Sequence, residues 1–306
     1  MRTHPPTLIT LVKRALRDEI KLPRGARILV ATSGGPDSMA LLDVLAGLTS
    51  RRGAPPPEPP RGFASNRYAA LRDSRSTPFE LVAHGVDHGL RENAAAELDL
   101  AEAHATRLGV VFSRSRVNVG SGSNLQARAR DARYAALEVA RKRAKAQVIA
   151  TAHHADDRAE TVLMRILRGA GASGLAVLPA QDGHLIRPLI RASRRDVDLH
   201  LERHGIASAR DPSNVDPRYL RTRVRLEVLP LLASLDPAIV SHLCALADDL
   251  GRFREGNEGI YPIPRAARLA LLRLAQSPNA TKKMTVRLPQ GLEVTKRNER
   301  THPKKR

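Results

Sequence analysis

The most constraining feature of the chain is a short loop between a strand-like run and a helix-like run. Consecutive apolar residues predict a buried strand over 27–32, and apolar residues at helical spacing predict a helix over 37–48. The loop between them reads Ser33-Gly34-Gly35-Pro36-Asp37-Ser38. A glycine turn in this position lets backbone N–H groups surround a phosphate at the positive end of the helix dipole. The sequence therefore predicts an anion-binding loop.

Asp37 narrows the choice of ligand, because a carboxylate repels a phosphate unless a divalent cation lies between them. The hydroxyls of Ser33 and Ser38 can donate hydrogen bonds to the same phosphate. The loop matches neither GxxxxGK[ST] nor GxGxxG, which excludes two common phosphate loops. The alternative is a plain strand-to-helix turn with Asp37 near the start of the helix.

The pattern along the chain alternates between strand-like and helix-like segments, which predicts an α/β fold: a Rossmann-like parallel sheet with helices on both faces. The expected strands are 27–32, 80–87, 109–117, 147–152 and 184–189, and the expected helices are 7–20, 37–48, 92–108, 124–145 and 155–168. Ligands of such sheets bind at the carboxyl ends of the strands. We therefore expect Ser33, Asp87 and His153 to share one edge of the sheet.

Two regions depart from this alternation. The segment 53–78 is rich in proline, glycine, serine and arginine, and we interpret it as an inserted loop. After residue 190 only helical patterns remain, at 192–204, 218–234, 236–254 and 264–276. The predicted domains are therefore a catalytic domain over 1–190, a small helical domain over 191–276 and a basic tail over 277–306. Within the tail, 284–288 and 292–295 have the pattern of a short hairpin.

Charge is the most unusual property of the composition. The 306 residues contain 51 Lys and Arg against 31 Asp and Glu, a net charge of +20, which favours a polyanionic partner such as nucleic acid. A general preference for arginine is the alternative. Aromatic residues make up 3% of the chain, so recognition by stacking bases on aromatic side chains is disfavoured. No apolar run is long enough to span a membrane, and we expect no targeting peptide.

A cluster after the fourth predicted strand carries the candidate catalytic groups. His153, Asp157 and Glu160 are spaced i, i+4 and i+7, so they share one face if the helix extends back to His153. We prefer two carboxylates that bind a cationic substrate and assist its deprotonation, because a protonated amine is not a nucleophile. A transition-metal site and simple capping of the helix are the alternatives.

Other polar groups belong to the same predicted edge. Asp87, His88 and Arg91 follow the second strand. Arg130 and Arg133 occupy neighbouring turns of one helix, where an arginine can stabilise a reacting phosphate or simply face solvent. A further arginine series, at positions 218, 221, 223 and 225, follows the Asp-Pro-Ser-Asn segment at 211–214 and suits either several phosphates or solubility.

These motifs occur in a recognisable order. In sequence they are SGGPDS, HGVDHGLR, ARDARY, AHHADDRAET, RGAGASGL, RPLI and DPSN. Over about residues 26–232 the chain resembles the tRNA(Ile)-lysidine synthetase family of the ATP pyrophosphatase (PP-loop) superfamily. The resemblance implies an adenine nucleotide alpha hydrolase-like fold and a two-step ligation. ATP first adenylates the wobble cytidine of the isoleucine tRNA that has a CAU anticodon, and free L-lysine then displaces AMP to give lysidine.

The resemblance also implies roles for individual residues. Residues 33–38 would bind the pyrophosphate of ATP, with Asp37 near Mg²⁺, and Arg130 and Arg133 would support adenylation. The adenylate and the lysine would be handled by His153, Asp157 and Glu160. The basic helical domain and tail would hold the anticodon arm, and a cytoplasmic enzyme is expected. Oligomeric state is left open, with a homodimer as one option.

Three other functions compete with this prediction. Enzymes of the superfamily that thiolate tRNA rely on several cysteines, whereas this chain has Cys244 alone, in the predicted helical domain. Small-molecule nitrogen ligases would have no use for the charge of +20. A non-catalytic RNA-binding protein would not need the intact Ser33, Asp37 and Ser38, and ATP binding would distinguish it.

Overall fold

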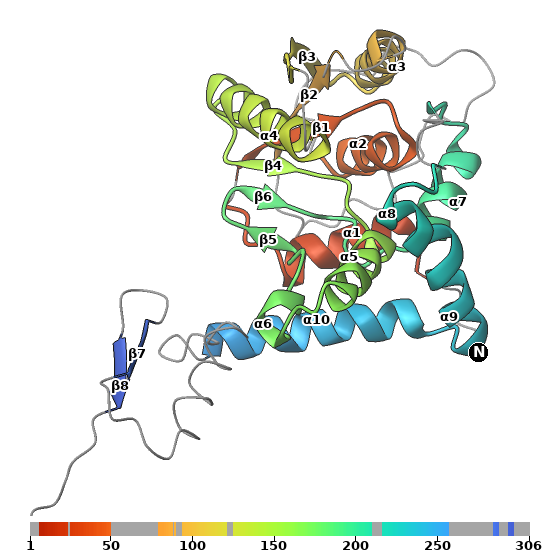
Figure 1. The fold of residues 1–306 in the computed structure, drawn as a ribbon. Coiled ribbons are helices and arrows are strands. Elements are labelled where there is room, and N and C mark those ends of the chain that lie inside the picture. Colours follow the sequence, from red (N-terminus) through yellow and green to blue (C-terminus); the bar gives the residue numbers. More distant parts are fainter. Residues whose placement is uncertain are drawn as a thin grey trace, which may run out of the picture. The chain divides into compact units, whose positions relative to one another are not determined.

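The computed structural model describes residues 6–23, 25–49, 79–87, 89, 94–120, 125–209, 216–256, 284–287 and 293–296. The predicted insertion at 53–78, the helix at 264–276 and the segment 211–214 lie outside the described residues, as do His88 and Arg91. The order of elements otherwise follows the predicted alternation of strands and helices (Figure 1).

A six-stranded sheet forms the centre of the fold. In spatial order its strands are β3 (Val111–Arg116), β2 (Glu80–Asp87), β1 (Arg27–Thr32), β4 (Val148–Ala150), β6 (Leu185–Ile186) and β5 (Gln181–Asp182). All neighbours are parallel except the β5–β6 hairpin, which the sequence did not predict. The chain moves from β1 outward to β3 and then returns to place β4 on the other side of β1. The junction of β1 and β4 is therefore the point where ligands of such sheets bind.

Most of the described helices match the predicted ones to within a few residues at each end, whereas α6 was not predicted and the helix expected at 218–234 is divided into α8, η3 and α9. They are α1 (Leu8–Asp18), α2 (Pro36–Leu48), α3 (Ala94–Arg107), α4 (Leu125–Arg143), α5 (Ala155–Leu167), α6 (Ala172–Leu175), α7 (Arg194–His204), α8 (Leu220–Arg223), the π-helical turn η3 (Val224–Val228), α9 (Leu229–Leu235) and α10 (Ile239–Gly256). Within the described residues, none of these helices is both long and apolar enough to cross a membrane by itself.

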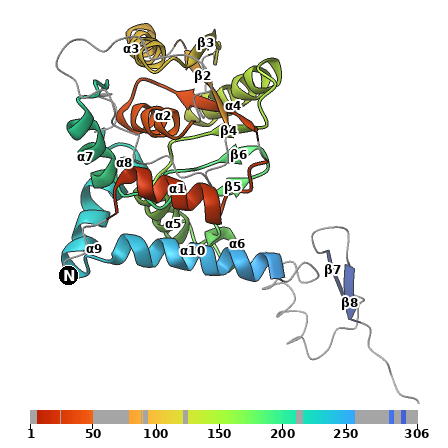
Figure 2. The ribbon, with the colours of Figure 1, turned by 180° about the vertical axis from the view of Figure 1, so that it is seen from behind.

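Strand β1 is buried on both faces of the sheet, and its successive side chains point in opposite directions. Ile28 and Val30 pack into the larger core, which α1, α2, α3 and α7 cover. Leu29 points the other way, onto Leu137 and Ala140 of α4. Figure 1 shows α4 in front of the strands, and the reverse view in Figure 2 shows α1 in front. These two layers of helices hold the carboxyl ends of β1 and β4 in fixed positions.

Contacts divide the chain into two compact units. The first contains Met1–Met164 and Leu178–Cys244, and the second contains Arg165–Val177 and Ala245–Arg306. In the second unit, β7 (Met284–Arg287) pairs antiparallel with β8 (Glu293–Lys296), as the hairpin pattern predicts. The division into a catalytic domain, a helical domain and a tail stays a prediction.

A buried polar network joins three helices beneath the site. His200 Nε2 of α7 lies 2.9 Å from Asp43 Oδ2 of α2, and His104 Nε2 of α3 lies 3.6 Å from Asp43 Oδ1. Burial lowers the pKa of His104 to about 4; Asp43 opposes this shift, and Arg107 and His200 add to it. The imidazole of His104 is therefore neutral at pH 7.

This network predicts acid sensitivity. An unfolded His104 binds its proton with an ordinary pKa near 6.5, so the folded state loses stability as the pH falls from about 6.5 to about 4. Asparagine does not titrate, and its side-chain oxygen can accept the hydrogen bond that Arg107 Nη2 donates to His104 Nδ1. Between pH 7 and pH 4.5, His104→Asn should lose about 2 kcal/mol less unfolding free energy than the wild type, measured by urea denaturation. Parallel pH dependence of the two proteins would contradict this role of His104.

Candidate active site

A cavity of about 1630 Å³ lies at the junction of β1 and β4, within the first unit. Most of its lining comes from the loop between β1 and α2, the connection from β4 into α5, helix α7 with the residues that follow it, and η3 with α9. Residues of β2, α3, α4 and α10 complete it. Of the predicted site residues, Ser33, Gly35, Pro36, Asp37, Ser38, His153, Asp157 and Glu160 line this cavity. Asp87 and Arg130 do not line it, whereas Arg133 does.

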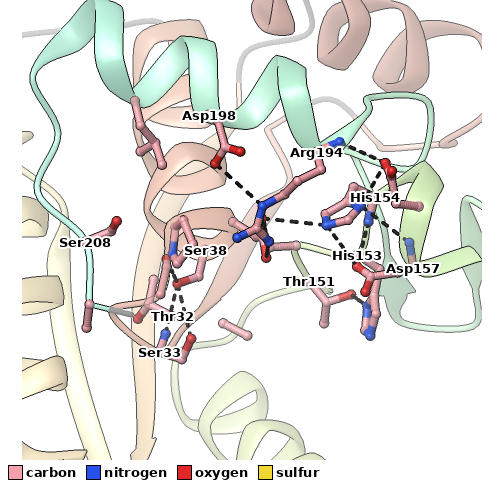
Figure 3. A pocket seen from close by; sticks show the side chains of 18 of the residues that line it. Thr32, Ser33, Ser38, Thr151, His153, His154, Asp157, Arg194, Asp198 and Ser208 are labelled. Carbon is pink, nitrogen blue, oxygen red and sulfur yellow. Dashed lines mark hydrogen bonds and ion pairs between the residues drawn. The ribbon is translucent and has the colours of Figure 1, made fainter. Parts of the chain in front are cut away.

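The loop after β1 is built by its own hydrogen bonds. The hydroxyl of Ser38 accepts a hydrogen bond from the Ser33 backbone N–H at 3.1 Å and donates one to the Gly35 carbonyl at 2.9 Å (Figure 3). The Ser38 hydroxyl therefore stabilises the conformation of the loop. Gly34 has φ +76°, and its carbonyl oxygen accepts a hydrogen bond from Ala209 N at 2.9 Å. Sequence reasoning missed Ala209, which lies 175 residues away from the loop.

Gly34 and Gly35 provide a matched pair of variants. A Cβ on Gly34 would overlap the carbonyl oxygen of Glu97 and would also require a left-handed backbone. We expect Gly34→Ala to lower the free energy of unfolding by about 2–3 kcal/mol and to abolish ATP binding. Gly35 has φ −73°, and a Cβ there meets Ser33 Oγ at an ordinary 3.4 Å. Gly35→Ala should therefore stay close to wild type in urea denaturation. Equal effects of the two variants would contradict this difference.

Asp37 lies at the start of α2 with two cationic groups around it. Arg194 Nη1 of α7 donates to both of its carboxylate oxygens, at 3.0 and 3.1 Å, and His154 Nε2 lies 3.7 Å from Oδ1. Burial raises the pKa of Asp37 above its usual range, and the charges of His154 and Arg194 oppose that rise. Figure 3 shows the side chain of Arg194 between Asp198 and His154.

His153 precedes helix α5, which begins at Ala155, so the condition for a shared i, i+4, i+7 face is not met. Its Nδ1 lies 3.0 Å from the hydroxyl of Thr151. Burial lowers the pKa of His153 to about 3; Asp157 opposes the shift, and the nearby guanidinium groups strengthen it. His153 is therefore a neutral imidazole at pH 7.

His154, which sequence reasoning did not select, is the more buried of the two histidines. Three carboxylates surround it: Asp37 at 3.7 Å and Asp157 at 3.5 Å from Nε2, and Asp156 at 3.6 Å from Nδ1. Burial alone would lower the pKa of His154, but these carboxylates together raise it above its ordinary value. The predicted capping of α5 is also present, since Asp157 Oδ2 accepts from the backbone N–H of His154 at 3.2 Å.

The two candidate carboxylates face a pair of arginines. Arg221 Nη2 donates to Asp157 at 2.7 Å, and Arg221 Nε donates to Glu160 at 2.8 Å. Arg225 Nε donates to the other oxygen of Glu160 at 2.6 Å. The helical turn η3 brings residues 221 and 225 to the same side, and π-helical turns are frequent at functional sites. Their spacing of four residues was the signal that could have separated them from Arg223, which pairs with Glu227 outside the cavity.

A basic cluster around Tyr134 contains Arg130, Arg133 and Arg187, of which Arg133 lines the cavity. Arg130 and Arg133 of α4 lie 5.0 and 5.4 Å from the centre of the Tyr134 ring, and Arg130 is exposed. Arg187 is 4% exposed, and burial lowers the pKa of its guanidinium. Within the described residues, the buried Nε atoms of Arg133 and Arg187 and the hydroxyl of Tyr134 have no hydrogen-bond partner. Buried donors of this kind attract an anion.

The donor set of the cavity is compatible with Mg²⁺ and not with a transition-metal centre. No three histidine, cysteine or carboxylate side chains in the described parts of the chain are arranged to hold a metal ion. The alternative of a transition-metal site at His153 and its neighbours is therefore not supported. Mg²⁺ commonly binds through one or two carboxylates together with substrate phosphates and water, and Asp37 beside the loop offers such a carboxylate.

Comparisons with known proteins agree with this geometry. A family model described as a PP-loop domain matches residues 8–232. The tRNA(Ile)-lysidine synthase of Thermobifida fusca (strain YX) is 37% identical over 293 residues, covering 88% of this chain and 82% of that relative. Its counterpart in Novosphingobium aromaticivorans is 35% identical and is covered to 76%. The chain spans less than half, 46%, of the Pseudomonas syringae pv. tomato protein of the same name, at 36% identity.

A solved structure shows the same fold. The U34-tRNA thiolase NcsA from Methanococcus maripaludis with its [4Fe-4S] cluster superposes with a TM-score of 0.59 at 19% identity, covering 83% of this chain and 81% of that one. Fold, loop and family model together define a PP-loop protein, a class that uses ATP. Within that class, the chain belongs to the tRNA(Ile)-lysidine synthase family.

Proposed function

We propose that this chain ligates L-lysine to the wobble cytidine of tRNA(Ile) with a CAU anticodon, through an adenylated-cytidine intermediate. One observation supports the proposal most strongly. In a member of the lysidine synthase family, the predicted phosphate-binding loop, the buried carboxylate of Glu160 and the half-buried carboxylate of Asp157 line the same cavity. The loop can hold ATP, and the carboxylates can hold the cationic amine of lysine, which reacts in the second step.

The first step transfers AMP to the base. The carbonyl oxygen of the cytosine attacks the α-phosphorus of ATP, and pyrophosphate leaves. Residues 33–38 hold the pyrophosphate portion through backbone N–H groups and the start of α2. Mg²⁺ at Asp37 would neutralise charge on the phosphates. Arg133, which lines the cavity, and Arg130, one turn earlier on α4, would stabilise negative charge during the transfer.

The second step replaces AMP with lysine. The carboxylates of Asp157 and Glu160 attract the ε-ammonium group and take part in removing its proton, and the free amine then attacks the activated carbon of the base. His153 stays neutral, so it adds no positive charge that would repel the lysine. Because Arg221 and Arg225 occupy these carboxylates here, the lysine amine must compete with them.

The RNA partner explains the charge of the chain. A net charge of +20 matches a polyanion, and we assign the anticodon arm to the helical part over 191–276 and the basic tail over 277–306. ATP, free lysine and tRNA all occur in the cytoplasm, where we expect the enzyme to work.

The direct test is incorporation of radiolabelled lysine into a tRNA(Ile) transcript with a CAU anticodon. We expect labelling that requires ATP and that is lost when the wobble cytidine is replaced by uridine. Release of AMP without labelling would keep an adenylating enzyme and reject lysine as the nucleophile. Absence of both signals in folded protein would leave a non-catalytic RNA-binding protein.

A further inference from the structure

Arg194 occupies the carboxylate that the proposed function assigns to a metal ion. Its Nη1 lies 3.0 and 3.1 Å from the two oxygens of Asp37, and its Nε lies 3.5 Å from Asp198, one turn further along α7. Its guanidinium lines the cavity beside the loop of residues 33–38 (Figure 3). The side chain is 42% exposed, so water reaches it from the cavity.

Hydrogen bonds fix the backbone at Arg194, whereas its side chain is partly exposed to solvent. Its N–H donates to Asp156 Oδ2 at 2.8 Å, and Ser193 and Asp196 form a capping box that fixes the start of α7. The guanidinium can therefore exchange partners by side-chain rotation alone, without movement of the helix. A phosphate bound on the loop would lie within the range of such a rotation.

A divalent cation bound at Asp37 would compete with the guanidinium of Arg194 for the carboxylate. Arg194 would then lose this partner when phosphate oxygens enter the cavity. A planar guanidinium is well suited to pair with those oxygens through two N–H groups. The same positive charge would stabilise the pyrophosphate as it leaves the α-phosphorus.

Resting on the proposed function, we propose that Arg194 is a pyrophosphate-binding residue: it pairs with Asp37 when the cavity lacks nucleotide and transfers to the β- and γ-phosphates when nucleotide and cation bind. The proposal makes Arg194 part of the loop's binding site although it lies 157 residues away on another helix. It also predicts that replacing Arg194 changes the affinities for the divalent cation and for pyrophosphate in opposite directions.

Arg194→Gln is the test, with Arg195→Gln as the matched control. Arg195 is the adjacent residue, carries the same charge and is exposed outside the cavity lining. We would measure binding of Mn²⁺ to the nucleotide-free protein by electron paramagnetic resonance, and binding of pyrophosphate in the presence of Mg²⁺ by calorimetry. Arg194→Gln should bind Mn²⁺ about threefold more tightly, because a partly exposed ion pair no longer competes. It should bind pyrophosphate about tenfold more weakly, because a charged hydrogen-bond donor is lost.

The opposite signs separate this role from a structural one. A variant that merely distorts the site would weaken both ligands, and that result would overturn the proposal, as would unchanged pyrophosphate binding. Arg194→Lys should recover part of the pyrophosphate affinity, since it restores the charge without the planar fork. If the wild-type protein does not bind pyrophosphate, the assignment of the loop fails, and the proposed function fails with it. If the wild-type protein and Arg195→Gln bind pyrophosphate tightly and Arg194→Gln binds it weakly, the role of Arg194 and the assignment of the loop are both supported.

Discussion

Replacing Asp37 with asparagine should reduce ATP-dependent AMP formation by about a thousandfold while leaving tRNA binding within about twofold of wild type. The carboxylate is the anionic group of the loop, and asparagine keeps its size while losing the charge that a divalent cation requires. AMP formation by thin-layer chromatography and RNA binding by fluorescence anisotropy measure the two effects. Equal losses in both would contradict the assignment of Asp37 to the nucleotide site.

Asp198→Asn is the control for this variant. Asp198 also contacts Arg194, at 3.5 Å, and its side chain is 61% exposed. The Asp198→Asn substitution removes a negative charge from the same cavity without changing the loop of residues 33–38. AMP formation should therefore change by less than about threefold. A large loss in this variant would show that the net charge of the cavity matters more than the position of Asp37.

Glu160→Gln is expected to impair the use of lysine by about a hundredfold and to impair adenylation much less. Glu160 is 1% exposed and holds both Arg221 and Arg225, so its charge balances the pair that the lysine amine must displace. Glutamine keeps the shape and one acceptor oxygen but cannot attract a cation. The lysine concentration dependence of labelling gives the first effect, and exchange of pyrophosphate into ATP gives the second.

Stability has to be followed for this variant as well, because loss of one partner of a buried ion pair can cost about 3–5 kcal/mol. Glu227→Gln provides the comparison: it removes the same charge from an exposed ion pair with Arg223, on the helical segment that also contains Arg221 and Arg225. Urea denaturation and lysine dependence should both stay close to wild type in that control. An unchanged lysine dependence in Glu160→Gln would reject its role.

The sequence predicts the sheet well because the signal is local. The strand over 27–32 is found with the predicted bounds, since its side chains are buried on both faces and read as one apolar run. The strand expected at 147–152 is shorter, Val148–Ala150, although the N–H of Thr151 still donates to the carbonyl of Ile186. The two-residue strands β5 and β6 are too short for any periodicity to reveal their hairpin.

The site is predicted only where its residues are neighbours in the chain. The loop at 33–38 and the carboxylates Asp157 and Glu160 are found because each forms a local motif. The arginines that pair with them are 61 to 157 residues away, so no spacing rule connects them. The local sequence also does not show which of His153 and His154 is surrounded by carboxylates. The third carboxylate beside His154, that of Asp37, is brought there only by folding.

The hydrogen bond between Ala209 and Gly34 has a consequence for recombining relatives of this protein. A chimera could take its first half from one family member and the region after α7 from another. The hydrogen bond between Gly34 and Ala209 would then join residues from two different parents. The crossover at residue 190 that the predicted domain boundary suggests would separate these two partners. A crossover placed after residue 209 would keep them together, and libraries built with that junction should retain a larger share of nucleotide-binding proteins.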